Sequence, residues 1–280
     1  MGNVLYTGAE PSRIMVHVLP FTFEVTSMKK TYAKFVLGLL AAVCCYAPSL
    51  VLAQDMPSPL AEEWMLVPKA GHASELAQAL KEHTAFRSEH GDPLQWEIYT
   101  PFLGNDLDRF AVRSCCTTWA DVDGYREWAR NAKEIMAHFS EHVEPLVETY
   151  GHYFEEIDWA NSHWDSEGGP YRFFEVTEFT VKPGLGDDFN AAREKMSQIA
   201  INQGWAAGGR SWLWASTIGG EPIVAIVVPQ KNLAGIARDG ENFAGFLARQ
   251  MGSEEAAADL MKQFSAATAS SSYQIWMLED

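Results

Sequence analysis

The chain has 280 residues and a formal net charge of −16, with 37 acidic against 21 lysine and arginine side chains. This acidity argues against nucleic acid and anionic lipid surfaces as partners, because both require basic patches that neutralise phosphate. All ten tryptophans follow residue 60, which is typical of a thick aromatic core or an aromatic-lined cavity.

The first part of the chain has the pattern of a leader. Residues 28–34 form a short basic segment, and an apolar run follows at 35–51. This order predicts a cleaved signal peptide over 28–53. Pro48 and the short apolar core favour that interpretation over a permanent transmembrane helix. Residues 1–27 are predicted to be an upstream extension, or alternatively a genuine leader. The mature protein would then be periplasmic or secreted, with a net charge of roughly −18.

Cys115 and Cys116 are the only cysteines beyond the predicted leader. Neighbours in a strand point to opposite faces, and a disulfide between adjacent cysteines departs from the usual bridge geometry. We therefore expect two thiols, one of them buried. Since the sequence contains no C-x-x-C motif, it does not support a thioredoxin-like role.

The mature region is predicted to contain two units, at 60–160 and 170–280, joined by a polar, glycine-containing linker at 161–169. Hydrophobic periodicity and turn residues predict the elements of the first unit. They are a strand at 62–68, a helix at 73–90, strands at 94–102 and 109–118, a helical stretch at 122–148 with a central break, and a strand at 150–159. In the second unit they are a strand at 173–181, a helix at 187–202, strands at 210–216 and 223–228, helical pieces at 233–249 and 254–267, and a strand at 272–278.

The second unit repeats landmarks of the first at a spacing of about 115 residues. The corresponding pairs are Glu63-Trp64 with Glu178-Phe179, Pro68 with Pro183, Gly71 with Gly186, and Trp96 with Trp212. The element order βαββαβ, found twice, predicts an α+β fold of tandem ferredoxin-like repeats. Because each sheet carries helices on one face only, the two bare faces can close on each other as a pseudo-symmetric barrel with an interior cavity.

This order resembles the dimeric α+β barrel superfamily in a fused, two-repeat form. Its relatives include antibiotic-biosynthesis-type monooxygenases, stress-responsive barrel proteins, NIPSNAP-like proteins and the haem-binding chlorite dismutase group. The resemblance covers nearly all of the mature region and depends on element order and duplication, so it implies a fold more strongly than a reaction. Fusion of two repeats removes the need for a dimer but still permits a homo-oligomer.

Five side chains are candidates for ligand binding. His83 lies on the apolar stripe of the first helix and could be a proton shuttle, a haem ligand or a hydrogen-bonding partner; the alternative is a core histidine bonded to a carbonyl. The aromatic residues Trp96, Tyr99, Trp212 and Trp214 lie on the second strand of each unit. They could stack on a flat ligand, although aromatic residues in sheets more often serve packing.

A second candidate site is the string His138-Phe139-Ser140-Glu141-His142. Histidines four apart share one side of a helix and can bind one metal ion, and H-x-x-E-H is the zinc-peptidase motif in which the internal glutamate acts as base. Glu221 lies near the spacing of a third ligand. In haem-binding barrel relatives a helix supplies the axial histidine, so His138 or His142 could also serve there. The alternative is a solvated helix face.

Three functions therefore remain open. The first is a non-catalytic exported protein that holds a small apolar or aromatic ligand, with no cofactor. The second is a monooxygenase-like enzyme, cofactor-free or haem-dependent, that uses His83 and the strand tryptophans. The third is a zinc hydrolase that uses His138, Glu141 and His142.

Overall fold

The computed structural model describes residues 58–237 and 240–279, which belong to one compact unit. The predicted extension and signal peptide lie outside the described residues, so export stays a prediction. Within the described part of the chain, no helix combines the length and the apolar character that a bilayer crossing requires.

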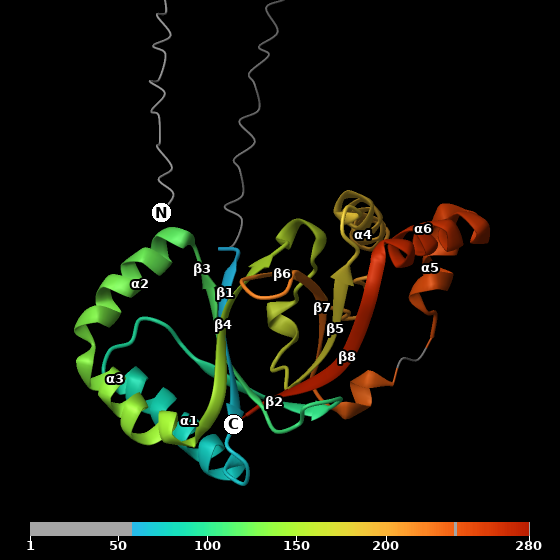
Figure 1. The fold of residues 1–280 in the computed structure, drawn as a ribbon. Helices are drawn as coiled ribbons and strands as arrows, with labels where there is room; N and C mark the ends of the chain where they lie inside the picture. The colour runs from blue at the N-terminus through green and yellow to red at the C-terminus, as the bar shows by residue number, and fades with distance from the viewer. Residues whose placement is uncertain (1–57, 238–239, 280) are drawn as a thin grey trace, which may run out of the picture. The chain divides into compact units, whose positions relative to one another are not determined.

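Helices and strands alternate in the same order in both halves (Figure 1). The first half contains β1 (Leu60–Pro68), α1 (Ala73–Glu89), β2 (Glu97–Leu103), β3 (Phe110–Thr117), α2 (Trp119–Asn131), α3 (Lys133–His138) and β4 (Val147–Ile157). The second half contains β5 (Phe173–Val181), α4 (Gly186–Asn202), β6 (Leu213–Ile218), β7 (Ile223–Gln230), α5 (Phe243–Met251), α6 (Glu254–Ala267) and β8 (Thr268–Leu278). This order confirms the predicted mixture of helices and strands.

The strands form a closed barrel in the order β1-β3-β2-β8-β5-β7-β6-β4. Each half contributes a ferredoxin-like sheet, and all the strand pairs are antiparallel. Two seams join the sheets, one between β2 and β8 and the other between β4 and β6. Closure leaves the barrel without an unpaired edge strand.

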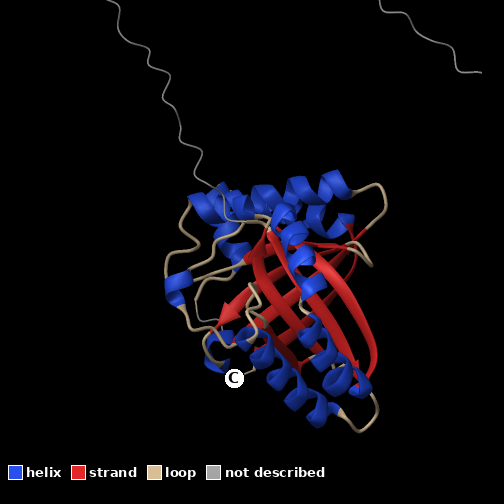
Figure 2. Ribbon diagram, turned by 90° about the vertical axis from the view of Figure 1, so that its left-hand side faces the viewer, coloured by secondary structure: helices blue, strands red, loops and turns tan. Residues whose placement is uncertain are grey.

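The helices cover the outer faces of the two sheets. In Figure 1, α1, α2 and α3 lie on one side of the barrel, and α4, α5 and α6 on the other; Figure 2 shows both helical layers flanking the strands. α1 buries Leu76, Leu80 and His83, which recur at helical spacing and face the sheet. In contrast, none of the residues of α2 is buried. The first half therefore has one tightly packed helix and one loosely attached one.

Residues that alternate with the helix-facing ones point into the barrel. At one end these are apolar, with Ala61, Ile157 and Leu213 packed together. Further along, Arg113 of β3 donates to Glu155 of β4, with an Nε–Oε2 distance of 3.0 Å. These two side chains are 21% and 20% exposed. The barrel interior thus carries charge as well as apolar packing.

Two predicted helical stretches are shorter in the structure than expected. The stretch predicted over 122–148 with a central break does divide, at Ala132, but it ends early, because β4 has already begun at Val147. Pro145 lies in the intervening 3-10 turn, where a proline cannot supply the backbone N–H that a continuing helix needs. The helix predicted over 233–249 is also divided. α5 begins only after Asn242, whose side chain accepts a hydrogen bond from the Gly245 N–H as an N-cap.

The expectation of two free thiols was wrong. Cys115 and Cys116 are joined by a disulfide, and both are exposed. The alternation argument assumes a regular strand, whereas the pairing of β3 with β1 shifts in register at these residues.

Candidate functional site

An aromatic and acid–base group lies on the helix-facing side of the first sheet. Trp64 of β1 stacks on His152 of β4, with ring centroids 4.0 Å apart and planes 10° apart. The buried carboxylate of Glu62 is 2.8 Å from His152 Nε2 and accepts from Trp64 Nε1 at 3.3 Å. The alternation of β1 explains the pairing, because Glu62 and Trp64 are two residues apart and so share a face.

The hydrogen bonds fix the tautomer of His152. Since a carboxylate can only accept, His152 must donate from Nε2 to Glu62. In the neutral ring the other nitrogen, Nδ1, is then an acceptor, and no hydrogen bond joins it to any described residue. The His152 side chain is 37% exposed. A carboxylate that orients an imidazole in this way leaves it able to take a proton from a bound molecule.

A second polar group fixes the C-terminal end of α1. Asp92 is fully buried and accepts from Arg87 Nε at 2.6 Å and from Trp96 Nε1 at 3.1 Å. Arg87 also donates to the Tyr125 hydroxyl of α2. Burial raises the pKa of Tyr125, Arg87 opposes this, and the carboxylates of Asp92 and Glu62 add to the rise. Tyr125 is therefore a neutral hydrogen-bonding group that attaches α2 to α1.

Three histidines lead from the surface into the same region. His142 is exposed, and its ring centroid lies 4.5 Å from that of the half-buried His138. His138 Nδ1 is 3.1 Å from Nδ1 of the buried His83. His83 Nε2 is buried and has no hydrogen-bond partner among the described residues. Burial, with Arg87, His138 and His142 nearby, lowers the pKa of His83 to about 4, so His83 is neutral.

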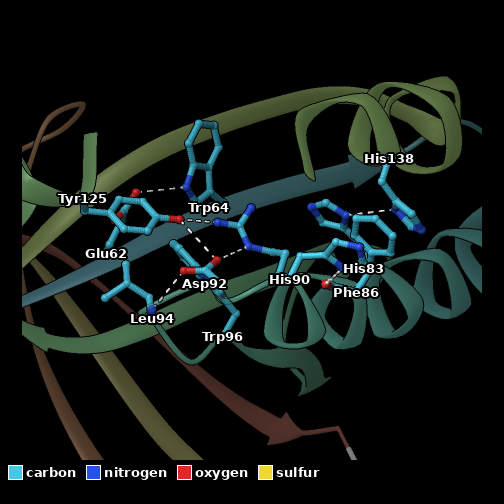
Figure 3. Close-up of polar contacts among 11 residues, drawn as sticks. Glu62, Trp64, His83, Phe86, His90, Asp92, Leu94, Trp96, Tyr125 and His138 are labelled. Carbon is cyan, nitrogen blue, oxygen red and sulfur yellow. Dashed lines mark hydrogen bonds and ion pairs between the residues drawn. The ribbon is translucent and has the colours of Figure 1, made fainter. Parts of the chain in front are cut away.

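We call these two polar groups and the His83–His138 pair the α1–α2 site. Figure 3 shows Glu62, Trp64 and Tyr125 at one end, His83 and His138 at the other, and Asp92 with Trp96 between them. The site is covered by α2, which touches β4 where Trp119 packs on Phe154 at 5.2 Å between ring centroids, and touches α1 through Tyr125.

A hollow of about 450 Å³ adjoins this site. It lies where α1 and α2 end and α3 begins, and its lining is His90, Trp128, Asn131, Ala132, Lys133, Glu134 and Ile135. The ring of Trp128 stacks on that of Tyr125, with centroids 5.2 Å apart. The volume matches that of a small organic ligand.

The predicted ligand-binding residues lie in three different places. His83 and Trp96 belong to the α1–α2 site. Trp212 and Trp214 are buried in the helix-side core of the second half, where their Nε1 atoms donate to Asn161 O at 2.9 Å and to Ser197 Oγ at 3.0 Å. These satisfied donors indicate packing.

Tyr99 points into the barrel. Its hydroxyl donates to Glu97 at 2.6 Å, and burial raises its pKa, with Glu97 adding to the rise. Tyr99 is therefore separated from His83 and Trp96 by the sheet.

The histidine string spans a change from α-helix to π-helix, and the rings of His138 and His142 lie close together as predicted. α3 ends at His138, and a π-helical turn covers Phe139–Val143. Glu141 is exposed, and Glu221 lies beside the β6–β7 turn of the second half. No group of three or more His, Cys, Asp or Glu side chains within 58–237 and 240–279 is arranged to hold a metal ion.

Sequence reasoning missed the acid–base partners of the α1–α2 site. Glu62 carries no motif, and its only sequence signal is a position two residues before Trp64 on a strand. His152 carries no motif either, and the sequence marks it only as a polar residue of the strand predicted at 150–159. Arg87 and Asp92 lie on either side of the end of α1, and only the fold shows that the loop after α1 turns Asp92 back onto Arg87.

No protein-family model matches the sequence, and no curated protein matches it either. Solved structures do match in fold. A candidate monooxygenase from Fusobacterium nucleatum has a TM-score of 0.50 at 8% identity, covering 80% of this chain and 94% of that one. A candidate monooxygenase from Lactobacillus acidophilus has a TM-score of 0.47 at 9% identity, covering 79% and 94%. An anthrone oxidase-like protein has a TM-score of 0.47 at 12% identity, covering 80% and 92%. At these identities the likeness concerns the fold alone, an α+β barrel like that of the Fusobacterium protein.

Proposed function

We propose that this protein binds a planar aromatic molecule with an ionisable hydroxyl group at the α1–α2 site and acts on it as a cofactor-free monooxygenase. The observation that carries the proposal is the stacked Trp64–His152 pair, in which the buried Glu62 holds the imidazole and leaves Nδ1 free. Aromatic side chains supply apolar area and a preferred stacking geometry for flat ligands. The fold shared with a candidate monooxygenase supports the reaction class by analogy only.

The residues suggest one proton-transfer step. His152 Nδ1 accepts the proton of the bound hydroxyl group, and the resulting imidazolium is stabilised by its hydrogen bond to Glu62. The phenolate that remains is richer in electrons than the phenol, which favours its reaction with dioxygen. The substrate itself is the reductant: one oxygen atom enters the ring as a carbonyl, and the other leaves as water with two hydrogens of the substrate. A site that covers the ligand with α2 also limits the access of water during this step.

A haem does not fit the histidines as they stand. His83 Nε2 is the buried imidazole nitrogen without a partner among the described residues, but it has no exposed surface for iron to reach. His138 Nδ1 is engaged with His83, and neither His138 nor His142 lines the hollow beside the site, so neither faces a space that a ligand could fill. We therefore propose chemistry without haem.

Binding can be tested with 1-naphthol as the probe and tryptophan fluorescence as the readout. We expect Trp64→Ala to weaken binding about tenfold, the effect of losing one aromatic stacking partner. The control is Trp205→Ala, since Trp205 is also half-buried but lies in the second half. Equal affinity in the Trp64 variant and the wild type would refute the location of the site.

Proton removal can be tested on the same complex from the absorbance of naphtholate. The wild type should lower the apparent pKa of bound 1-naphthol, whereas His152→Asn should bind the naphthol without lowering it. His72→Asn is the control, because His72 is an exposed histidine on the turn before α1. If His152→Asn ionises the bound naphthol as the wild type does, His152 is not the base. Oxygen uptake then separates an enzyme from a non-catalytic binder, which would ionise naphthol without consuming dioxygen.

We also propose that the two halves derive from a tandem duplication and that the mature chain is exported. The repeated element order and the leader-like sequence support these statements. Mass spectrometry of the secreted or periplasmic fraction tests export, through an N-terminus near residue 54.

A further inference from the structure

The Cys115–Cys116 disulfide lies at the point where the chain leaves the barrel wall for α2. In the pairing of β1 with β3, Ala61 opposes Cys115 and Leu60 opposes Thr117, so Cys116 has no partner in this register. Thr117 ends β3, and Thr118 after it is the N-cap of α2. An extra residue of this kind is a β-bulge, a local irregularity that redirects the strand. The two sulfurs therefore lie at the irregular end of β3, just before α2, and we call this segment, residues 115–118, the hinge of α2.

This disulfide does little to hold the fold together. A cross-link restricts the unfolded chain through the length of the loop that it closes, and here the joined residues are adjacent. Both cysteines are also exposed, and exposed disulfides are more accessible to attack by thiolates than buried structural ones. A stabilising role therefore does not explain the bond, whereas its place at the hinge of α2 suggests control of that helix.

α2 is attached to the rest of the molecule by few contacts. None of its residues is buried. Its start is held by the capping box between Thr118 and Asp121 and by Trp119 against Phe154, and its middle by the bond from Arg87 to Tyr125. A helix with so little burial depends strongly on the direction in which its first residues leave the preceding strand.

We propose that Cys115–Cys116 is a redox-modifiable site, reversibly reduced by external dithiols, whose state controls how firmly α2 is held against the first half. One thiolate of the dithiol attacks a cysteine sulfur, which breaks the Cys115–Cys116 bond and forms a mixed disulfide. The second thiol of the reagent then releases the protein and closes the reagent's own disulfide. Two electrons and two protons pass to the protein, which then carries two thiols.

Opening the bond frees the backbone at Cys116, which has no opposing residue in the ladder with β1, so the attachment of α2 loosens. The consequence for ligand binding rests on the proposed function, because α2 covers the α1–α2 site. The redox site and its effect on α2 do not depend on the proposed function.

The first test is alkylation of the folded full-length chain with iodoacetamide, with and without prior dithiothreitol. Cleavage after Arg113 and Arg126 gives one peptide, 114–126, that contains both cysteines. We expect no label without reductant and two labels after it, under conditions in which the protein stays folded. Label without reductant would show that the bond is absent, and no label after native reduction would show that it is inaccessible; either result overturns the proposal.

The second test is amide hydrogen exchange on the same two samples. Reduction should speed exchange in α2 roughly tenfold while α1 is unchanged, since only α2 follows the hinge. The double variant Cys115→Ser, Cys116→Ser should exchange rapidly in α2 with or without reductant, and its unfolding midpoint should match that of the wild type. Unchanged exchange in α2 after confirmed reduction would contradict the proposal. Binding of 1-naphthol to both redox forms tests the functional consequence separately, because its failure would count against the proposed function and leave the labelling and exchange results intact.

Discussion

Glu62 and Glu63 are neighbours on β1 but face opposite sides of the barrel wall. Glu62 faces the helices, where His152 and Trp64 bind its carboxylate. Glu63 lies beside Arg113 in the barrel register. Burial raises the pKa of Glu63 to about 8, with repulsion from Glu155 adding to the rise and Arg113 opposing it. Position on the strand, and not residue type, therefore gives these carboxyl groups different chemistry.

The raised pKa of Glu63 makes stability depend on pH. The folded protein keeps the Glu63 proton up to about pH 8, whereas the unfolded chain releases it near pH 4.5. The contribution of this group to the free energy of unfolding is therefore full below pH 4.5 and is lost as the pH rises to about 8. Glu63→Gln cannot lose the proton. Relative to wild type, its free energy of unfolding should rise between pH 5 and pH 9 by at most about 5 kcal/mol, at about 1.4 kcal/mol per pH unit. Chemical denaturation at both pH values measures it, with the exposed Glu148→Gln as control. A difference independent of pH would show that Glu63 is ionised at neutral pH.

His83 should make the stability of the protein depend on pH in the opposite direction. Its pKa of about 4 lies below the ordinary 6.5, so the unfolded chain takes up a proton that the folded protein refuses, and stability is lost as the pH falls from 6.5 to 4. His83→Leu removes this loss and keeps the apolar stripe of α1. Between pH 7 and pH 4.5 the variant should gain up to about 3 kcal/mol relative to wild type. His72→Leu, at an exposed position, should show no such gain. If the two variants respond alike, burial does not depress the pKa of His83.

At the scale of secondary-structure elements, α1 and α2 differ in how they are held. α1 is fixed by buried apolar residues, whereas α2 depends on a few polar and edge contacts. Tyr125→Phe removes the hydroxyl that binds Arg87 and Asp92. Amide exchange in α2 should become faster, with a loss of global stability of only about 1 kcal/mol, the usual contribution of one hydrogen bond. Tyr150→Phe is the control, because Tyr150 is exposed on β4. Equal exchange in both variants would mean that Tyr125 does not anchor α2.

Helices and strands with a strong hydrophobic periodicity could be predicted from the sequence. Helix ends that depend on single residues could not. The helix expected at 73–90 and the strand at 173–181 agree closely with α1 and β5, because their apolar residues recur at the period of the element. The early end of the helical stretch before β4 and the late start of α5 depend on a proline and on an N-cap. Those signals are single residues inside otherwise helical patterns.

The candidate site could be predicted only in part, for the same reason. His83 and Trp96 stood out as unusual residues in periodic elements. Their partners come from elsewhere in the chain, since His152 is 90 residues from Glu62 and Tyr125 is 38 from Arg87. The hydrophobic periodicity of a sequence does not indicate which distant side chains lie together in a barrel.

For the whole molecule, the two seams should make unfolding cooperative. β2 pairs with β8 and β4 pairs with β6, so neither sheet can open without breaking a ladder to the other. Leu76→Ala, at a fully buried position of the first half, should cost about 2–5 kcal/mol. Amide exchange should show α4 and β7 of the second half destabilised as much as α1. Leu103→Ala, at a position 54% exposed, is the control. A second half that keeps its protection in the Leu76 variant would show that the halves unfold independently.

We propose that the first half, between its sheet and α2, holds the small-molecule site. A crystal structure of the full-length protein with bound 1-naphthol tests this claim most directly. We expect the naphthol ring to lie against Trp64, with its oxygen within hydrogen-bonding distance of His152 Nδ1. A naphthol bound inside the barrel beside Glu63 and Arg113, or among the helices of the second half, would contradict it.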